Sequence, residues 1–172
     1  MLEIEIKAHC ADMESVKAKL GEMGASLHEI RDEADLYFNH PSRDFRNTDE
    51  AFRIRSVNGR AYLTYKGPKL GTRSKTRFEE ELGVESSESM RVILGKLGFV
   101  EVREVRKHRE LYHLQGFEVC LDLVEGLGSF VEIEQQGEDR ERVEKELFDL
   151  AAKLGLDRFE TRAYLEMLEN GA

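Results

Sequence analysis

Apolar and charged residues alternate with a period of two along most of this chain. The first such stretch is Leu-Glu-Ile-Glu-Ile-Lys at residues 2–7. A β-strand points successive side chains to opposite faces, so this stretch has one apolar face and one charged face. The same pattern predicts eight strands in all, at residues 2–8, 26–38, 51–58, 61–67, 72–83, 99–114, 117–125 and 129–136.

Four stretches have the periodicity of an amphipathic helix instead. The first runs between Asp12, which suits an N-cap, and Gly24, which suits a helix end. The others are predicted around residues 90–97, 143–154 and 162–169. Asn-Gly at 58–59 and Gln-Gly at 115–116 are tight-turn signals between neighbouring strands. The chain therefore reads as a run of antiparallel strands with a few helices.

The charged strand faces suggest an enclosed interior. For any one strand, an open antiparallel sheet with one wet face explains the alternation well. Eight strands joined by short turns favour closure, because a closed barrel has no exposed edges and about eight strands leave room for a small ligand. We expect an α+β fold, an eight-stranded antiparallel β-barrel with flanking helices, as one domain over residues 1–172.

Composition adds two constraints. Charged residues make up 35% of the 172 residues, above the usual quarter, so much of the charge needs a place inside the barrel. The net charge of −9 argues against general nucleic-acid affinity as the function. The chain has no run of 18 apolar residues and no signal-peptide pattern, and Cys10 and Cys120 suit small buried thiols. We expect a cytoplasmic protein that binds neither nucleic acid nor membrane.

Both signs of charge occur on the faces that parity turns inward. The members are Glu3, Glu5, Lys7, Arg53, Arg55, Lys66, Arg73, Lys75, Arg77, Glu79, Glu81, Arg103, Lys107, Arg109, Glu118, Asp122, Glu132 and Glu134. Arg and Lys from many strands can surround a triphosphate. Carboxylates would repel the phosphates unless a divalent ion lies between, and Mg²⁺ or Mn²⁺ prefers oxygen ligands. The pattern indicates a metal–triphosphate site for phosphoryl or nucleotidyl transfer.

An ordered set of motifs resembles the CYTH family, also called triphosphate tunnel metalloenzymes. The hallmark Glu-x-Glu-x-Lys is present near the N-terminus at residues 3–7. The later motifs, in order, are Arg53-x-Arg55, Lys66-Gly67-Pro68, Arg77-x-Glu79-x-Glu81, Lys107-x-Arg109, Asp122 and the stretch 126–134. The resemblance implies an eight-stranded tunnel, a requirement for Mg²⁺ or Mn²⁺, a triphosphate substrate and a homodimer.

The resemblance also implies roles for individual residues. It assigns the metal site to Glu3, Glu5, Asp122, Glu132 and Glu134, without settling which of them touch the ion. It assigns phosphate binding to Lys7, Arg53, Arg55, Lys66, Arg77, Lys107 and Arg109. It makes Glu5, Lys7, Lys107 and Arg109 the catalytic set. For the strand of Arg77, Glu79 and Glu81, a purely structural ion-pair role stays open.

The stretch from Asp35 to Arg55 resembles the class IV adenylyl cyclase branch. That branch converts ATP to cyclic AMP and pyrophosphate. Other branches hydrolyse inorganic tripolyphosphate or thiamine triphosphate at the terminal phosphate. The expected function is the cyclase, with the triphosphate hydrolase as the alternative and a non-catalytic binder of ATP or polyphosphate as a third reading.

Overall fold

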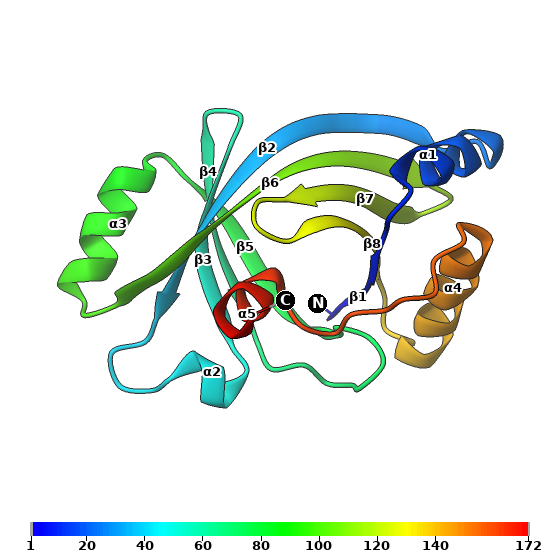
Figure 1. The fold of residues 1–172 in the computed structure, drawn as a ribbon. Coiled ribbons are helices and arrows are strands. Elements are labelled where there is room, and N and C mark those ends of the chain that lie inside the picture. Colours follow the sequence, from blue (N-terminus) through cyan, green and yellow to red (C-terminus); the bar gives the residue numbers. More distant parts are fainter. Residues whose placement is uncertain (1, 172) are drawn as a thin grey trace.

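Eight antiparallel strands close into a barrel in the computed structural model, which describes residues 2–171 (Figure 1). The strands are β1 (Leu2–His9), β2 (Ser26–Asn39), β3 (Ala51–Val57), β4 (Arg60–Lys66), β5 (Arg77–Val84), β6 (Val100–Leu114), β7 (Phe117–Val124) and β8 (Gly128–Gln136). Their order around the barrel is β1-β5-β4-β3-β2-β6-β7-β8, and the pairing of β8 with β1 closes it. The predicted fold class is confirmed.

The two tight turns set the register of their hairpins. Asn58 and Gly59, between β3 and β4, have φ of 50° and 73°. Gln115 and Gly116, between β6 and β7, have φ of 49° and 88°. Positive φ at both central residues matches the right-handed twist of the flanking strands, which is why Asn-Gly sequences favour such turns. Both hairpins predicted from the sequence are present.

The fifth strand is shorter than predicted. It begins at Arg77 and not at residue 72, because the preceding residues form a loop that contacts other elements. The backbone N–H of Lys75 in this loop donates to the carbonyl of Glu5 on β1, at 2.7 Å. Parity therefore fails here, and Arg73 points outward with its guanidinium 4.8 Å from the ring centre of Phe148.

The sixth strand also departs from the predicted face at its beginning. Arg103 was placed inward by parity, but its side chain is 46% exposed. Its guanidinium donates to the backbone carbonyl of Leu168. The β2–β6 ladder has a register shift at this point, between Tyr37 and Phe38, which breaks the alternation. From the buried Val105 onward, the predicted inward face holds.

Helices flank the barrel, and the longer ones cover its apolar outer faces. They are α1 (Met13–Glu22), α2 (Phe45–Thr48), α3 (Ser87–Lys96), α4 (Arg140–Lys153) and α5 (Tyr164–Asn170), of which the short α2 was not predicted. Helices α1 and α4 lie on one side of the barrel and α3 on the opposite side (Figure 1). The largest core cluster joins α1 and α4 to β1, β7 and β8, with Ile4, Leu20, Val119, Ile133 and Leu147 fully buried.

The N-termini of the longer helices explain where these elements begin. Asp12, Ser86 and Asp139 each accept a hydrogen bond from the backbone N–H three residues later, which satisfies a donor that the helix cannot use. Cys10 and Cys120 are buried free thiols, as expected. Among residues 2–171, none of the helices has the length and apolar character needed to cross a membrane.

Candidate active site

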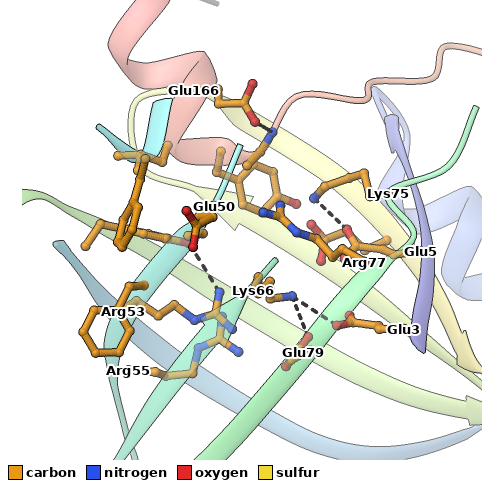
Figure 2. Close-up of a pocket in the computed structure, with 18 of the residues that line it drawn as sticks. Glu3, Glu5, Glu50, Arg53, Arg55, Lys66, Lys75, Arg77, Glu79 and Glu166 are labelled. Atoms are coloured by element: carbon orange, nitrogen blue, oxygen red, sulfur yellow. Dashed lines mark hydrogen bonds and ion pairs between the residues drawn. The ribbon is translucent and has the colours of Figure 1, made fainter. Parts of the chain in front are cut away.

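The barrel encloses a cavity of about 550 Å³, a size typical of small-molecule sites. All eight strands contribute side chains to its wall, and so do α2 and α5. Most lining residues are charged, and both signs are present: Glu3, Glu5, Lys66, Lys75, Arg77 and Glu79 appear together in Figure 2. The charged strand faces predicted from alternation therefore meet in one enclosed space.

Three carboxylates form an acidic cluster, which consists of Glu3, Glu5 and Glu134. One oxygen from each lies within 4.8 Å of the others. The register places them, because Glu5 stands directly opposite Glu134 in the β1–β8 ladder and Glu3 is two residues away on the same face. Three carboxylate oxygens at this spacing suit Mg²⁺ or Mn²⁺, so the residues present fit a divalent ion.

The charge state of the acidic cluster supports this fit. Burial, with Glu3 nearby, holds the pKa of Glu134 well above its usual range. Burial and Glu132 raise the pKa of Glu5. Burial alone would also raise the pKa of Glu3, but Lys66 outweighs it and the pKa falls to about 2. Without a bound cation, the cluster thus holds more carboxylates than its surroundings can keep ionised.

Two lysines face the acidic cluster. The Nζ atom of Lys66 lies 3.2 Å from Glu3 and 2.8 Å from Glu79 (Figure 2). The Nζ atom of Lys75 lies 2.9 Å from Glu5 (Figure 2). Parity also places Lys75 on the inward face, but Lys75 lies outside the motif Arg77-x-Glu79-x-Glu81 and is not among the predicted site residues; it reaches the cluster from a loop.

Arg77 lines the cavity but binds backbone. Its Nε donates to the carbonyl of Gly67 at 2.6 Å, and an Nη donates to the carbonyl of Asp49 at 3.0 Å. These bonds hold two loops at the end of the barrel that carries α2. The geometry gives Arg77 a role in positioning these loops, and its role in phosphate binding stays a prediction.

A second charged group, the β2 network, consists of Arg53, Arg55 and Lys107, which are predicted site residues, and of Glu33 and Asp35 on β2, which are not. Asp35 is fully buried and accepts from both ends of the Arg55 fork, at 2.7 and 2.8 Å. Lys107 lies 3.0 Å from both Asp35 and Glu33. Burial alone would raise the pKa of Asp35, yet Arg55, Lys107 and Arg53 hold it well below its usual range. The donors of Arg55 and Lys107 are therefore largely occupied by carboxylates.

Arg53 is the exception in that network. Its guanidinium is buried, yet Nε has no hydrogen-bond partner among the described residues. One of its Nη atoms donates to the Tyr37 hydroxyl, at 3.3 Å, and lies 3.7 Å from Asp35. A buried donor left unpaired is costly unless a ligand or water completes it. Arg53 is therefore available to an anion in the cavity.

The β2 network predicts a loss of stability in acid. Burial alone would raise the pKa of Glu33, yet Arg109, Arg55 and Lys107 hold it well below its usual range. Because the folded pKa is depressed, this contribution to the free energy of unfolding is present above the unfolded value of about 4.3 and is lost as pH falls below it. Urea unfolding from pH 7 to pH 3 should show the stability difference between wild type and Glu33→Gln shrinking below about pH 4. A difference that stays constant over that range would contradict the ionised network.

A third charged group pairs Asp122 and Glu132, two of the predicted metal ligands, with Arg109. Arg109 donates to both oxygens of Asp122, at 2.7 and 2.6 Å, and to Glu132 at 2.7 Å. The Tyr164 hydroxyl donates to Asp122 at 2.7 Å. The structure thus does not bring Asp122 and Glu132 into the acidic cluster, and their contact with a metal stays a prediction.

Lys7 lies behind this third group. Its Nζ is fully buried, 3.9 Å from the ring centre of Tyr164 and 3.9 Å from Glu132, and has no hydrogen-bond partner among the described residues. Burial, with Lys75 nearby, lowers the pKa of Lys7 to about 7. Lys7 is absent from the cavity wall, whereas Tyr164 is part of it. Tyr164 follows the barrel on a helix, so strand alternation gave no signal for it.

One part of the cavity wall is apolar. Phe45 on α2, Phe52 on β3, Val102 on β6 and Leu165 on α5 contribute to it. Arg53 and Lys66 line the same cavity. An apolar surface next to a polycationic one suits a ligand that has a planar organic group as well as phosphates.

Comparison with known proteins shows the family. Residues 1–164 match the model of the CYTH domain. A protein of Methanocaldococcus jannaschii named "Putative adenylate cyclase MJ0240" is 41% identical, with 97% of this chain and 98% of that protein covered. "Adenylate cyclase CyaB" of Aeromonas hydrophila is 26% identical, with 97% and 88% covered.

A solved structure has the same fold as this chain. The "PH1819 protein" of Pyrococcus horikoshii OT3 superposes with a TM-score of 0.91 at 37% identity, and 99% of each chain is covered. The fold, the enclosed charged cavity and the sequence likeness all point the same way. The chain belongs to the CYTH domain family, in the branch whose members are named adenylate cyclases.

Proposed function

We propose that this protein is a metal-dependent adenylyl cyclase that converts ATP to cyclic AMP and pyrophosphate. The observation that carries the proposal is that one cavity combines a three-carboxylate cluster, buried arginines and lysines, and an apolar wall. Inorganic tripolyphosphate would use the first two features and leave the apolar wall unused. The names of the two relatives point to the same reaction.

The acidic cluster is the proposed metal site. Glu3, Glu5 and Glu134 would hold Mg²⁺ or Mn²⁺ through carboxylate oxygens. When bound, such an ion supplies positive charge that neutralises phosphate oxygens and the charge developing on a leaving group. Without that ion, the negative carboxylates would repel the negative phosphate chain.

The basic residues would hold the phosphate chain in place. Arg53 offers an unpaired donor, and Lys66 and Lys107 line the same wall. In a cyclase the ribose 3′-hydroxyl gives its proton to water and its oxygen bonds to the α-phosphorus, while the bond from that phosphorus to the bridging oxygen breaks and pyrophosphate leaves. Fixed cations around the departing pyrophosphate lower the barrier because they need no reorganisation during the reaction.

The reaction itself is tested with purified protein, Mg²⁺ or Mn²⁺, and three substrates: ATP, tripolyphosphate and thiamine triphosphate. Cyclic AMP with an equal amount of pyrophosphate supports the proposal. Release of orthophosphate supports the triphosphate hydrolase instead. Tight binding without any product would make the protein a non-catalytic binder of ATP or polyphosphate.

Arg53→Met should weaken triphosphate binding more than monophosphate binding. The substitution removes a buried guanidinium with an unpaired Nε and keeps an apolar stem. Charge-assisted hydrogen bonds contribute about 1.5–3 kcal/mol, so we expect an increase in Kd of about tenfold to a hundredfold for ATP and a smaller one for AMP. Calorimetric titration with Mg²⁺ present measures both.

Arg106→Met is the matched control for this experiment, because Arg106 points outward with a side chain that is 62% exposed. It should leave both dissociation constants within about twofold of wild type. Equal weakening of ATP and AMP by Arg53→Met would argue against recognition of the phosphate chain.

A further inference from the structure

Lys75 carries a buried ammonium group into the acidic cluster from a loop. Its Nζ lies 2.9 Å from Oε1 of Glu5, and its side chain is 9% exposed. Lys75 lines the same cavity as Glu134 and the proposed phosphate-binding residues, and Figure 2 shows it together with Glu3 and Glu5. In the absence of a metal, Lys75 is therefore the counter-ion of a carboxylate that is proposed to bind one.

The loop holds the backbone of Lys75 in place. The N–H of Lys75 donates to the carbonyl of Glu5 at 2.7 Å. The hydroxyl of Ser74 donates to Glu144 on α4 at 2.8 Å and lies 2.7 Å from that of Thr76. Ser74 and Thr76 are buried. The backbone is thus fixed on both sides of Lys75, and any change of partner falls to its flexible four-carbon side chain.

Lys75 differs from Lys66 in the number of carboxylates within salt-bridge distance of its ammonium group. Lys66 lies within salt-bridge distance of both Glu3 and Glu79, so it keeps one partner if the other is taken. For Lys75, Glu5 is the one carboxylate within salt-bridge distance in residues 2–171. A divalent ion bound by Glu5 would share that carboxylate with Lys75 and repel its ammonium group. The two cations therefore compete for one ligand.

We propose that Lys75 exchanges partners during the reaction. In the free protein it neutralises Glu5, and when a divalent ion takes that carboxylate the ammonium group turns to the phosphate chain of the substrate. The inference rests on the proposed function, and it adds a phosphate-binding residue to it. Lys75 therefore weakens metal binding in the absence of substrate and strengthens triphosphate binding when the metal is bound.

Two binding measurements on Lys75→Met test this exchange without relying on turnover. The first is Mn²⁺ binding to the substrate-free protein, followed by electron paramagnetic resonance at pH 8.5, where protons compete less for the carboxylates. Loss of the competing ammonium should tighten Mn²⁺ binding by at least about fivefold. The second is calorimetric titration of tripolyphosphate at saturating Mg²⁺, where loss of the same group should weaken binding by at least about fivefold.

Two further variants control for charge and location. Lys75→Arg keeps the charge and should stay close to wild type in both measurements. Lys69→Met removes a lysine from the same loop, whose Nζ lies 2.7 Å from Asp49 and 3.0 Å from Glu166, away from the acidic cluster. It should leave Mn²⁺ affinity unchanged. If circular dichroism shows Lys75→Met to be unfolded, Lys75→Gln takes its place, because its amide still donates to Glu5 without a charge.

The opposite signs of the two expected effects separate the exchange from a structural role, since a merely loosened site would weaken both ligands. Unchanged or weaker Mn²⁺ binding in a folded variant overturns the inference and leaves the proposed function standing. Tighter Mn²⁺ binding with unchanged tripolyphosphate binding overturns the second half of the exchange. If wild type itself binds neither Mn²⁺ nor tripolyphosphate, the proposed function fails, and the inference fails with it.

Discussion

Glu5→Gln should abolish metal-dependent turnover while leaving the barrel folded. The substitution removes one of the three carboxylates of the acidic cluster but keeps an oxygen that can accept from Lys75, 2.9 Å away. An amide oxygen is a weaker ligand for a hard divalent ion than a carboxylate. A bound ion contributes several kcal/mol of transition-state stabilisation, so we expect turnover to fall by about a thousandfold or more. Product formation from ATP over a range of Mn²⁺ concentrations measures this.

The control for this variant is Glu110→Gln. Glu110 lies on β6 but points outward, where it pairs with Lys17 on α1 at 2.8 Å. Its loss should change turnover by less than about twofold, because this half-buried ion pair lies on the outer face of the barrel and not in the cavity wall. Circular dichroism spectra of both variants should match that of wild type. Full activity of Glu5→Gln with an unchanged dependence on Mn²⁺ would show that the acidic cluster is not the metal site.

Alternation of apolar and charged residues predicts the barrel well because the two faces of each strand lie in different environments. One face packs under helices, as Ile4 and Ile6 do, and the other turns to a cavity lined by ions. The prediction fails at residues 72–76, where the polar pattern continues but the chain leaves the sheet. Contacts from Ser74 to α4 and from Lys75 to β1 hold this loop, and such long-range contacts leave no local signal.

The candidate site is only partly readable from parity. Parity places Glu3, Glu5 and Glu134 inward, but their grouping depends on the β1–β8 register, which sets Glu134 opposite Glu5 and Glu132 opposite Lys7. Register is a property of two distant segments. The β2 network is different, because Glu33 and Asp35 stand out in the alternation of their own strand and parity would have found them. No period-two pattern leads to Tyr164, which reaches the cavity from α5.

Asp35→Asn should destabilise the protein by about 3–5 kcal/mol, the usual cost of breaking a buried ion pair from one side. Asp35 is fully buried and faces three cations: Arg55, Lys107 and Arg53. The amide keeps the shape and removes the charge. Arg55 and Lys107 then keep Glu33 as a carboxylate partner, whereas Arg53 loses the one carboxylate within salt-bridge distance of it among the described residues. The chain has no tryptophan, so urea unfolding is best followed by circular dichroism.

The same variant gives a second signal that a simple packing defect would not. Tripolyphosphate supplies negative charge to the cations that Asp35 no longer neutralises, so adding it should recover more stability in Asp35→Asn than in wild type. Asp32→Asn, on the same strand but with a side chain that is 88% exposed, should change stability by less than about 0.5 kcal/mol and show no such difference. A loss in the free energy of unfolding below about 1 kcal/mol for Asp35→Asn would mean that water in the cavity already screens much of the charge of this network. The cations of the barrel wall would then be freer to bind phosphate than their ion pairs suggest.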